Sequence, residues 1–332
     1  MVVVISFFLT FSLRKYALSK NILDIPNFRS SHAVPTPRGG GVAIVLVFLI
    51  TLPILYLIDL VSFSSLIALL GAGAVVAVIG FADDHGHIAA RWRLAAHLIA
   101  AIWAIFWFGG LPPISVAGLT VTSSFVSGLF SVLYLVWMLN LYNFMDGIDG
   151  LASLEAIAVC VGGAVIYWSL GEFSYAYLPL VLAGAVTGFL FLNFPPAKIF
   201  MGDAGSGFLG ITLGILSIQA AWVAPQLLWS WLILLGVFIV DATFTLLRRL
   251  LRGDKVYEAH RSHGYQYASR HYKQHLPVTL GVTVINLVWL FPLALIVALG
   301  FVDGFLGLLL AYAPLFFLAV KFKSGAHEAQ NV

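Results

Sequence analysis

Carboxylate and amide side chains gather in three short segments of a sequence that has few charged residues. Side-chain oxygens of this kind suit a hard cation such as Mg²⁺, which proteins usually hold by one or two groups together with substrate phosphates. Two adjacent carboxylates repel each other, and a bound cation or a raised pKa relieves that repulsion. The pattern indicates a site for a divalent cation and a phosphate. Its residues are the pair Asp83 and Asp84, the series Asn143, Asp146 and Asp149, and the single Asp203.

The series Asn143, Asp146 and Asp149 places a polar residue at every third position. At about 100° per residue, this spacing keeps the three side chains within one arc of a helix. Gly147 and Gly150 allow the backbone to turn or to approach a ligand closely. A simpler interpretation is a capped turn, in which Asp and Asn bind the amides at a helix start. Such a density of polar residues in so apolar a chain favours the site.

Basic and glycine-rich segments could hold the phosphate. Arg91 and Arg93 follow the Asp pair, and they serve either topology or phosphate binding. Residues 200–207 form a glycine-rich turn that leads into a predicted helix, whose first amides could receive a phosphate. The segment 248–276 is rich in Arg, Lys and His, and includes His260, Arg261 and His263. Its two histidines share a helix face, but zinc is disfavoured because no third ligand is near.

The composition sets the class of protein that must position these residues. Of 332 residues, 61% are hydrophobic and only 9% are charged, whereas an ordinary soluble domain has about 25% charged residues. A soluble enzyme and a disordered chain are therefore excluded, and an all-α polytopic membrane protein is predicted. The net charge of +3 is too small to indicate nucleic acid as a partner. The single Cys160 predicts neither a disulfide nor a metal cluster.

Apolar runs predict ten or eleven transmembrane helices, because a span in lipid must satisfy its own backbone hydrogen bonds. Two of them, 94–110 and 207–223, are near the short limit for a span. The first run lacks a basic segment and a cleavage site, so it is interpreted as a retained span. The predicted spans are 2–18, 41–60, 63–82, 94–110, 124–142, 151–170, 176–194, 207–223, 226–247, 277–298 and 302–321.

Eleven spans place all 17 Lys and Arg residues on one side. By the positive-inside rule this side is cytoplasmic, so the N-terminus is expected to be periplasmic. The carboxylate and histidine segments lie on the same side, which is therefore the expected active face. Asp241 falls inside the ninth span, where we expect it to pair with a basic neighbour such as Arg248 or to serve the site. Residues 1–332 form one predicted integral-membrane domain, with 322–332 as a short cytoplasmic tail.

Carboxylates for a cation, basic loops for phosphate and a position at the membrane surface favour one kind of chemistry. They suit phosphoryl transfer between a soluble nucleotide donor and a lipid acceptor, a reaction in which the protein mainly positions two anions and neutralises their charge.

Five motifs in order then identify a resemblance that covers about residues 20–270. The chain resembles the polyprenyl-phosphate N-acetylhexosamine-1-phosphate transferases of the WecA and MraY superfamily. The motifs are Arg29-Ser-Ser-His32 with Pro35-Thr-Pro-Arg-Gly-Gly-Gly41, the Asp83-Asp84 pair, Asn143-Phe-Met-Asp-Gly-Ile-Asp-Gly-Leu-Ala152, Phe200-Met-Gly-Asp-Ala-Gly-Ser206, and His260-Arg-Ser-His-Gly-Tyr-Gln266.

The resemblance implies a reaction and its participants. A UDP-N-acetylhexosamine donates its sugar 1-phosphate to undecaprenyl phosphate and releases UMP. Mg²⁺ is required, with Mn²⁺ as an alternative. The family setting is the bacterial cytoplasmic (inner) membrane, and a homodimer is a family-level expectation. The segment at 260–266 differs from the triple-histidine segment of the peptidoglycan branch. It is similar to the branch that initiates O-antigen or another surface polysaccharide, and it argues against a muramyl-pentapeptide substrate.

The resemblance also implies roles for individual residues. Asp203 and Asn143 match the positions at the metal, and Phe200 matches one that can stack on uracil. Asp83 and Asp84 match the pair assigned to the acceptor phosphate, and Asp146 and Asp149 complete the expected catalytic carboxylates. The loop with His260, Arg261 and His263 matches the segment that helps to select the sugar, and Arg91 and Arg93 are expected to bind substrate phosphate.

Two other classes remain as alternatives. An ion-coupled secondary transporter places acids near the middle of its spans, whereas most acids here lie at span ends on one side. A UbiA-type prenyltransferase also uses Asp motifs and Mg²⁺, but those motifs space the acids by four residues. It would leave Asp203 and the histidine loop unexplained.

Overall fold

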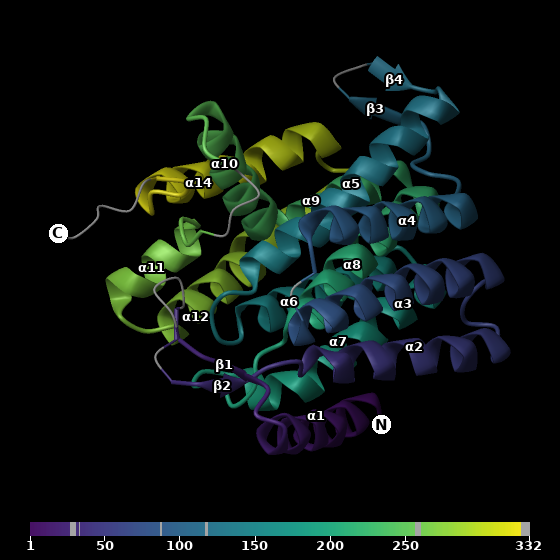
Figure 1. The fold of residues 1–332 in the computed structure, drawn as a ribbon. Coiled ribbons are helices and arrows are strands. Elements are labelled where there is room, and N and C mark those ends of the chain that lie inside the picture. The colour runs from purple at the N-terminus through teal and green to yellow at the C-terminus, as the bar shows by residue number, and fades with distance from the viewer. Residues whose placement is uncertain (27–30, 33, 87, 117–118, 256–259, 327–332) are drawn as a thin grey trace.

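The computed structural model is a bundle of α-helices with two short β-hairpins (Figure 1). The structure describes residues 1–26, 31–32, 34–86, 88–116, 119–255 and 260–326. Arg29, Ser30 and the predicted tail beyond 326 lie outside these residues. The elements are α1 (Val2–Ser19), β1 (Leu23–Asp24), β2 (Thr36–Pro37), α2 (Gly41–Leu57), α3 (Phe63–His85), α4 (Ala90–Phe108), β3 (Ile114–Val116), β4 (Leu119–Val121), α5 (Ser124–Met145), α6 (Leu151–Ser169), a 3₁₀ turn (Phe173–Ala176), α7 (Tyr177–Asn193), α8 (Asp203–Val223), α9 (Pro225–Leu234), α10 (Gly236–Leu251), α11 (Gly264–Tyr272), α12 (Leu276–Ile285), a π-helical turn (Asn286–Leu290), α13 (Phe291–Ala298) and α14 (Gly304–Lys321).

Each of the eleven apolar runs is helical, which confirms the all-α membrane fold. Within the described residues, eight helices are long and apolar enough to cross a membrane, or nine if the bent pair α9 and α10 is one span. Ten or eleven spans were predicted. The difference lies in α2, which has only 17 residues, and in α4, which begins at Ala90 and so includes Arg91 and Arg93.

The predicted span 226–247 is not one helix. The chain bends by 74° between α9 and α10, so α10 leaves the direction of the bundle (Figure 1). The bend carries Asp241 and the following loop to the end of the bundle where α11 and the β1–β2 hairpin lie. The β3–β4 hairpin lies at the other end (Figure 1).

The helix boundaries differ from the predicted ones where the polar motifs begin. α3 continues to His85, so Asp83 and Asp84 lie in its last turn, and α8 begins at Asp203 itself. α5 ends at Met145, so Asp146 and Asp149 lie in a turn beyond the helix. The prediction that Asn143, Asp146 and Asp149 share one helix face is therefore wrong, since glycines in the turn release the chain from helical geometry.

Helix α8 is the centre of the bundle, with 89% of its most apolar stretch buried. Glycines allow its first turn to approach two other helices closely. A Cβ at Gly80 of α3 would lie 2.6 Å from the backbone of Ala204, and Gly41 of α2 faces Gly205 at a similarly close approach. The loop before α2 is bonded to the strand-like segment before α8, since Phe200 N donates to Pro37 O at 2.8 Å. These contacts bring Asp203 to the end of α3.

Candidate active site

Arg93 joins carboxylates from two segments that are far apart in the sequence. Its Nη1 lies 2.6 Å from Asp83 Oδ2 and 3.7 Å from Asp203 Oδ2. Asp83 also accepts a hydrogen bond from the amide of Ile88 at 2.7 Å, which fixes the loop between α3 and α4. Arg93 is about one-third exposed. Its guanidinium therefore reaches the cavity and could also bind a phosphate oxygen, since arginine offers several donors in a fixed fork.

Asp84 has a different position from Asp83, although the two are adjacent. Its carboxylate accepts the amide of Asp203 at 3.1 Å and the amide of Ala204 at 3.3 Å, so it caps the start of α8. Its backbone carbonyl accepts a hydrogen bond from the Arg38 guanidinium. Because Asp84 is only 4% exposed, its main contact is the helix that carries Asp203. Its carboxylate thus holds the start of α8, and Asp84 also lines a cavity with Asp203.

Asn143 and Asp146 face the same cavity as Asp203. Asn143 Oδ1 accepts a hydrogen bond from Ser206 Oγ at 3.1 Å, which ties the end of α5 to the first turn of α8. No hydrogen bond to the Asp146 carboxylate occurs within the described part of the chain. Burial, and then the charges of Asp203, Asp84 and Asp149, raise the pKa of Asp146 to about 7. Carboxylates that oppose each other's ionisation in this way favour a bound cation.

Asp149 is held by groups from two other segments. Its Oδ2 accepts the amide of Ala197 at 3.0 Å, and its Oδ1 lies 3.2 Å from His275 Nδ1. Burial opposes the ionisation of Asp149, but the hydrogen bonds from His275 and Ala197 outweigh it and lower the pKa. Asp149 is therefore an ionised residue that fixes the turn.

Two further contacts hold the turn that contains Asp146 and Asp149. Asn193 accepts the Gly150 amide at 3.1 Å and donates to the Ile199 carbonyl at 3.0 Å. The Tyr265 hydroxyl donates to the Phe144 carbonyl at 2.9 Å and passes directly over Gly147, where any side chain would collide with it. The turn is thus fixed between α7 and α11.

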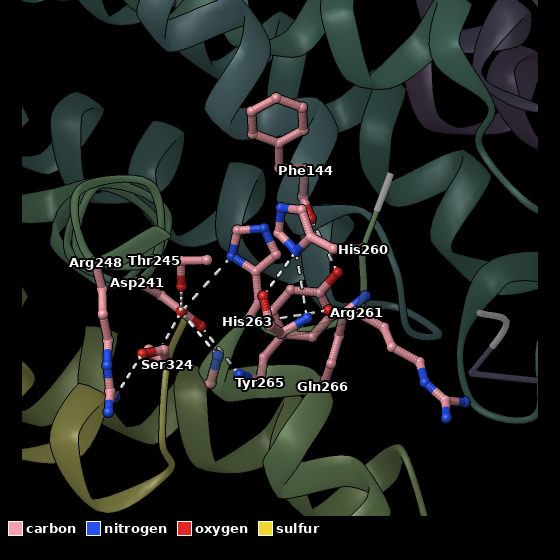
Figure 2. Close-up of polar contacts among 12 residues, drawn as sticks. Phe144, Asp241, Thr245, Arg248, His260, Arg261, His263, Tyr265, Gln266 and Ser324 are labelled. Carbon is pink, nitrogen blue, oxygen red and sulfur yellow. Dashed lines mark hydrogen bonds and ion pairs between the residues drawn. The ribbon is translucent and has the colours of Figure 1, made fainter. Parts of the chain in front are cut away.

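The histidine loop is attached to the bundle by Asp241 (Figure 2). Asp241 accepts the amides of Gly264 at 2.8 Å and Tyr265 at 3.0 Å, and so caps α11. It also accepts the hydroxyl of Ser324 at 3.0 Å. The basic neighbour of Asp241 is His263, whose Nδ1 lies 3.7 Å from Asp241 Oδ1, whereas Arg248 donates instead to the Ser324 carbonyl. The bend before α10 is what brings Asp241 under this loop.

The two histidines of this loop stack on each other at 5.0 Å between ring centroids, beside Phe144 and Tyr265 (Figure 2). Burial, and then the neighbouring charges of His263 and Arg249, lower the pKa of His260 to about 3. His260 is therefore neutral at physiological pH, so one of its ring nitrogens donates and the other accepts a hydrogen bond. Its Nδ1 is bonded to Ser262. The side chain of Arg261 extends away from both rings (Figure 2).

Three cavities follow one another through this end of the molecule. The central cavity, of about 590 Å³, is lined by residues that include Arg38, Phe200, His32 and Asp84. It shares Asn143, Asp146, Gly147, Asp203 and Gln266 with a cavity of about 510 Å³ between α3, α4, α5 and the histidine loop. It shares Ser31, Asp149 and His275 with a cavity of about 480 Å³ that reaches Arg270 and Lys273.

The structure brings together most of the predicted site residues. Each of the following lines at least one of the three cavities: Asp83, Asp84, Arg93, Asn143, Asp146, Asp149, Phe200, Asp203, His260 and His263. Arg91 does not line them. It is exposed and lies over the ring of Trp92. Arg261 is also absent from the walls of these cavities, because its side chain is directed away.

Sequence reasoning missed His275, Gln266 as a wall of the cavity, and Arg38 as a contact of Asp84. Arg38 and Gln266 lie within motifs that were recognised, whereas no sequence motif marks His275. Phe200 packs its ring against His32 at 4.8 Å between centroids, a contact across 168 residues of sequence that no local pattern indicates.

The donor set fits a magnesium ion shared with a substrate. Within the described residues, no group of three His, Cys, Asp or Glu side chains could hold a metal ion unaided. Asp203 and Asp146 offer carboxylate oxygens and Asn143 offers its amide oxygen, and no donor among the described residues bonds to the Asp146 carboxylate. Magnesium is commonly held by one or two protein groups and completed by substrate phosphates, so the chemistry of these residues fits that ion.

A bundle of membrane helices with an oxygen-rich site of this kind defines a class, the membrane transferases of sugar phosphates. Residues 66–221 match the family described as glycosyl transferase family 4. The chain belongs to this family, within the WecA and MraY superfamily.

Three individual proteins are similar to this chain over most of its length. The decaprenyl-phosphate N-acetylglucosaminephosphotransferase of Mycobacterium tuberculosis (strain ATCC 25618 / H37Rv) is 32% identical over 300 residues, covering 78% of this chain and 72% of that protein. The probable undecaprenyl-phosphate N-acetylglucosaminyl 1-phosphate transferase of Bacillus subtilis (strain 168) is 31% identical over 255 residues, covering 76% and 70%. The phospho-N-acetylmuramoyl-pentapeptide-transferase of Streptococcus thermophilus (strain CNRZ 1066) is 28% identical over 241 residues, covering 68% of each.

Proposed function

We propose that this protein transfers N-acetylhexosamine 1-phosphate from a UDP-linked sugar to undecaprenyl phosphate and releases UMP. A phosphate oxygen of the lipid attacks the β-phosphorus of the donor, and the bond between that phosphorus and the oxygen of UMP breaks. The bond between sugar C1 and its oxygen stays intact, so the anomeric configuration is retained. The product is a lipid-linked sugar diphosphate.

The observation that carries this proposal is the order of the cavities around one cluster of carboxylates. Asp203, Asp146 and Asn143 line both the central cavity and the cavity beside α4. The cavity beside α4 has apolar walls from Val76, Ile79, Leu94 and Leu139, together with Arg93 and the histidines. It therefore suits a lipid phosphate and a sugar, whereas the central cavity with Phe200 suits the nucleotide. The two reacting phosphates meet at the shared carboxylates.

Asp203 and Asn143, with Asp146 beside them, are the residues that would hold Mg²⁺, with Mn²⁺ as an alternative. When bound, the ion neutralises the donor diphosphate and makes UMP a better leaving group. Arg93 can hold the acceptor phosphate while Asp83 fixes its guanidinium. A general base is not required, since a lipid phosphate is largely ionised at neutral pH. Phe200 is the candidate for stacking on uracil.

The choice of sugar depends on the histidine loop. His260 and His263 present stacked rings to the cavity beside α4, and Asp241 fixes the start of α11 below them. One relative is named an N-acetylglucosaminephosphotransferase and another a probable N-acetylglucosaminyl 1-phosphate transferase, so UDP-N-acetylglucosamine is the donor to test first. We place the reaction at the first membrane step of O-antigen or a related surface polysaccharide. A homodimer in the membrane is part of this proposal.

The orientation is also a proposal. The described basic residues lie at helix ends and in loops on the side of the carboxylates, as the positive-inside rule requires of a cytoplasmic face. The protein is then a multi-pass protein of the bacterial inner membrane, with its site open to the cytoplasm. A cytoplasmic site agrees with a donor that is a soluble nucleotide sugar.

The test is UMP release by purified protein from a panel of UDP-N-acetylhexosamines, with undecaprenyl phosphate and Mg²⁺ present. We expect UMP and lipid-linked sugar only when lipid and metal are both supplied, and none after chelation by EDTA. Asp203→Ala should abolish turnover while its thermal unfolding stays within a few degrees of wild type. Full activity of Asp203→Ala would refute the metal assignment, and a folded protein that releases no UMP from any donor would refute the reaction.

A further inference from the structure

His275 connects three loops of the site. It lies directly before α12, and its two ring nitrogens face groups from different parts of the chain. Nδ1 lies 3.2 Å from Asp149 Oδ1, in the turn after α5. Nε2 lies 2.9 Å from the carbonyl of Ser31, in the loop between β1 and β2. One side chain therefore joins segments that are separated by more than a hundred residues.

The surroundings of His275 favour the doubly protonated ring. Nδ1 faces the Asp149 carboxylate and also lies 3.4 Å from the Asp149 amide, while Nε2 faces the Ser31 carbonyl. Burial lowers the pKa of His275, but the Asp149 carboxylate and the Ser31 carbonyl outweigh it and raise the pKa. The side chains of His275 and Asp149 are 16% and 12% exposed. Other charged groups nearby are His32, Asp24, Arg270 and Lys273, on the walls of the two cavities that meet here.

The position of this contact in the central cavity indicates which part of a donor it serves. Asp203 and Asp146 lie where the central cavity meets the cavity beside α4, and the reacting diphosphate belongs there. His275, Asp149 and Ser31 lie where the central cavity meets the cavity that reaches Lys273. A nucleotide sugar whose diphosphate is at the carboxylates then extends its nucleoside toward His275.

We propose that His275 is a positioning residue for the nucleoside of the donor. By holding Asp149 and Ser31 together, it fixes the wall of the central cavity at the nucleoside end, and it takes no part in the bond exchange. This inference rests on the proposed function. The proposed role of His275 concerns binding of the donor and not of the lipid acceptor, because the cavity beside α4 does not include His275.

The test compares His275→Ala and His275→Gln with His271→Gln in steady-state assays. His271 is an exposed histidine on α11, four residues earlier, and is not part of any wall of the three cavities. Loss of one charge-assisted contact of the wall is worth about tenfold in affinity, or roughly 1.4 kcal/mol. We expect His275→Ala to raise the KM for the UDP-sugar about tenfold. The KM for undecaprenyl phosphate should not change, and kcat should stay within twofold. His275→Gln, which can still donate one hydrogen bond, should show a smaller rise, and His271→Gln none.

The outcomes separate the role of His275 from the reaction itself. An active wild type and a His275→Ala variant with an unchanged KM for the donor would refute the positioning role alone. An equal rise in the KM for the UDP-sugar and the KM for undecaprenyl phosphate would refute the positioning role as well, because it indicates general damage. So would an equal rise in the donor KM of His275→Ala and His271→Gln. Should His275→Ala not fold, His275→Gln supplies the same comparison. A wild-type protein that releases no UMP refutes the proposed function, and the role of His275 with it.

Discussion

Replacing Asp84 with Asn separates a helix cap from a catalytic base. Asp84 accepts the amides of Asp203 at 3.1 Å and Ala204 at 3.3 Å, one on each carboxylate oxygen. An Asn side chain keeps the shape but has only one oxygen, so one of the two amides faces an NH₂ group and loses its acceptor. It also removes a negative charge from the start of α8, where the helix dipole stabilises it.

The magnitude follows from these two losses. A hydrogen bond to a charged group contributes about 1.5–3 kcal/mol, and a charge at a helix start contributes up to about 1 kcal/mol more. We expect Asp84→Asn to destabilise the protein by roughly 2–3 kcal/mol, which lowers Tm by at least about 4 °C. Because Asp203 is the first residue of α8, its displacement should also lower kcat. The assay is thermal unfolding in detergent beside UMP release.

The control is Asp83→Asn, since Asp83 contacts Arg93, the Ile88 amide and the Asp203 side chain but accepts no backbone amide of α8. It should lose activity with a smaller change in Tm than Asp84→Asn. If Asp84→Asn loses kcat a hundredfold while its Tm equals that of wild type, Asp84 is not a cap in function and the positioning argument fails.

Three further predictions concern the turn after α5 and the interior. Gly147→Ala should lower kcat/KM about tenfold, because its Cβ displaces the Tyr265 hydroxyl and overpacking costs about 1–3 kcal/mol. Adding Tyr265→Phe should restore part of the activity. A double variant that is no more active than Gly147→Ala would contradict the clash. The pKa of Asp146 is raised to about 7, so its proton stabilises the fold at low pH and this stability is lost as pH rises through about 7. Asp146→Asn should raise Tm at pH 8 in EDTA and should lower turnover. A gain in Tm at pH 4 but not at pH 8 would contradict the raised pKa of Asp146. Asn286 Nδ2 donates to Glu155 Oε2 at 2.5 Å, while Glu155 Oε1 and Asn286 Oδ1 have no partner among the described residues. Glu155→Gln, which can form two hydrogen bonds with Asn286, should keep Tm near that of wild type. Asn286→Leu should lower the free energy of unfolding by about 2 kcal/mol. Equal Tm values for the two variants would contradict this pairing.

The site could be predicted in its residue types but not in its division of labour. The adjacent acids Asp83 and Asp84 look alike in the sequence, yet one side chain reaches Arg93 and the other caps α8. Neighbouring positions on a helix point about 100° apart, and only the packing of α3 against α8 decides what each direction meets. The same holds for Arg91 and Arg93, of which only Arg93 reaches the cavity.

The sequence by itself determined the class of fold and which residue types could form the site. Its low charge and long apolar runs predict helices that cross a membrane, because a long apolar segment satisfies its own backbone hydrogen bonds in lipid as a helix. Its oxygen and basic side chains, in motifs that lie in order along the chain, predict a site for a cation and phosphates.

Only the tertiary structure decided how those motifs meet. The bend between α9 and α10 places Asp241 under the histidine loop, and close glycine contacts bring the start of α8 to the end of α3. Contacts such as that of His275 with Asp149 join residues 126 positions apart, and such pairs depend on how whole helices pack. Local spacing carries no information about them, since a side chain's direction is set by its own helix but its partner is set by the neighbouring one.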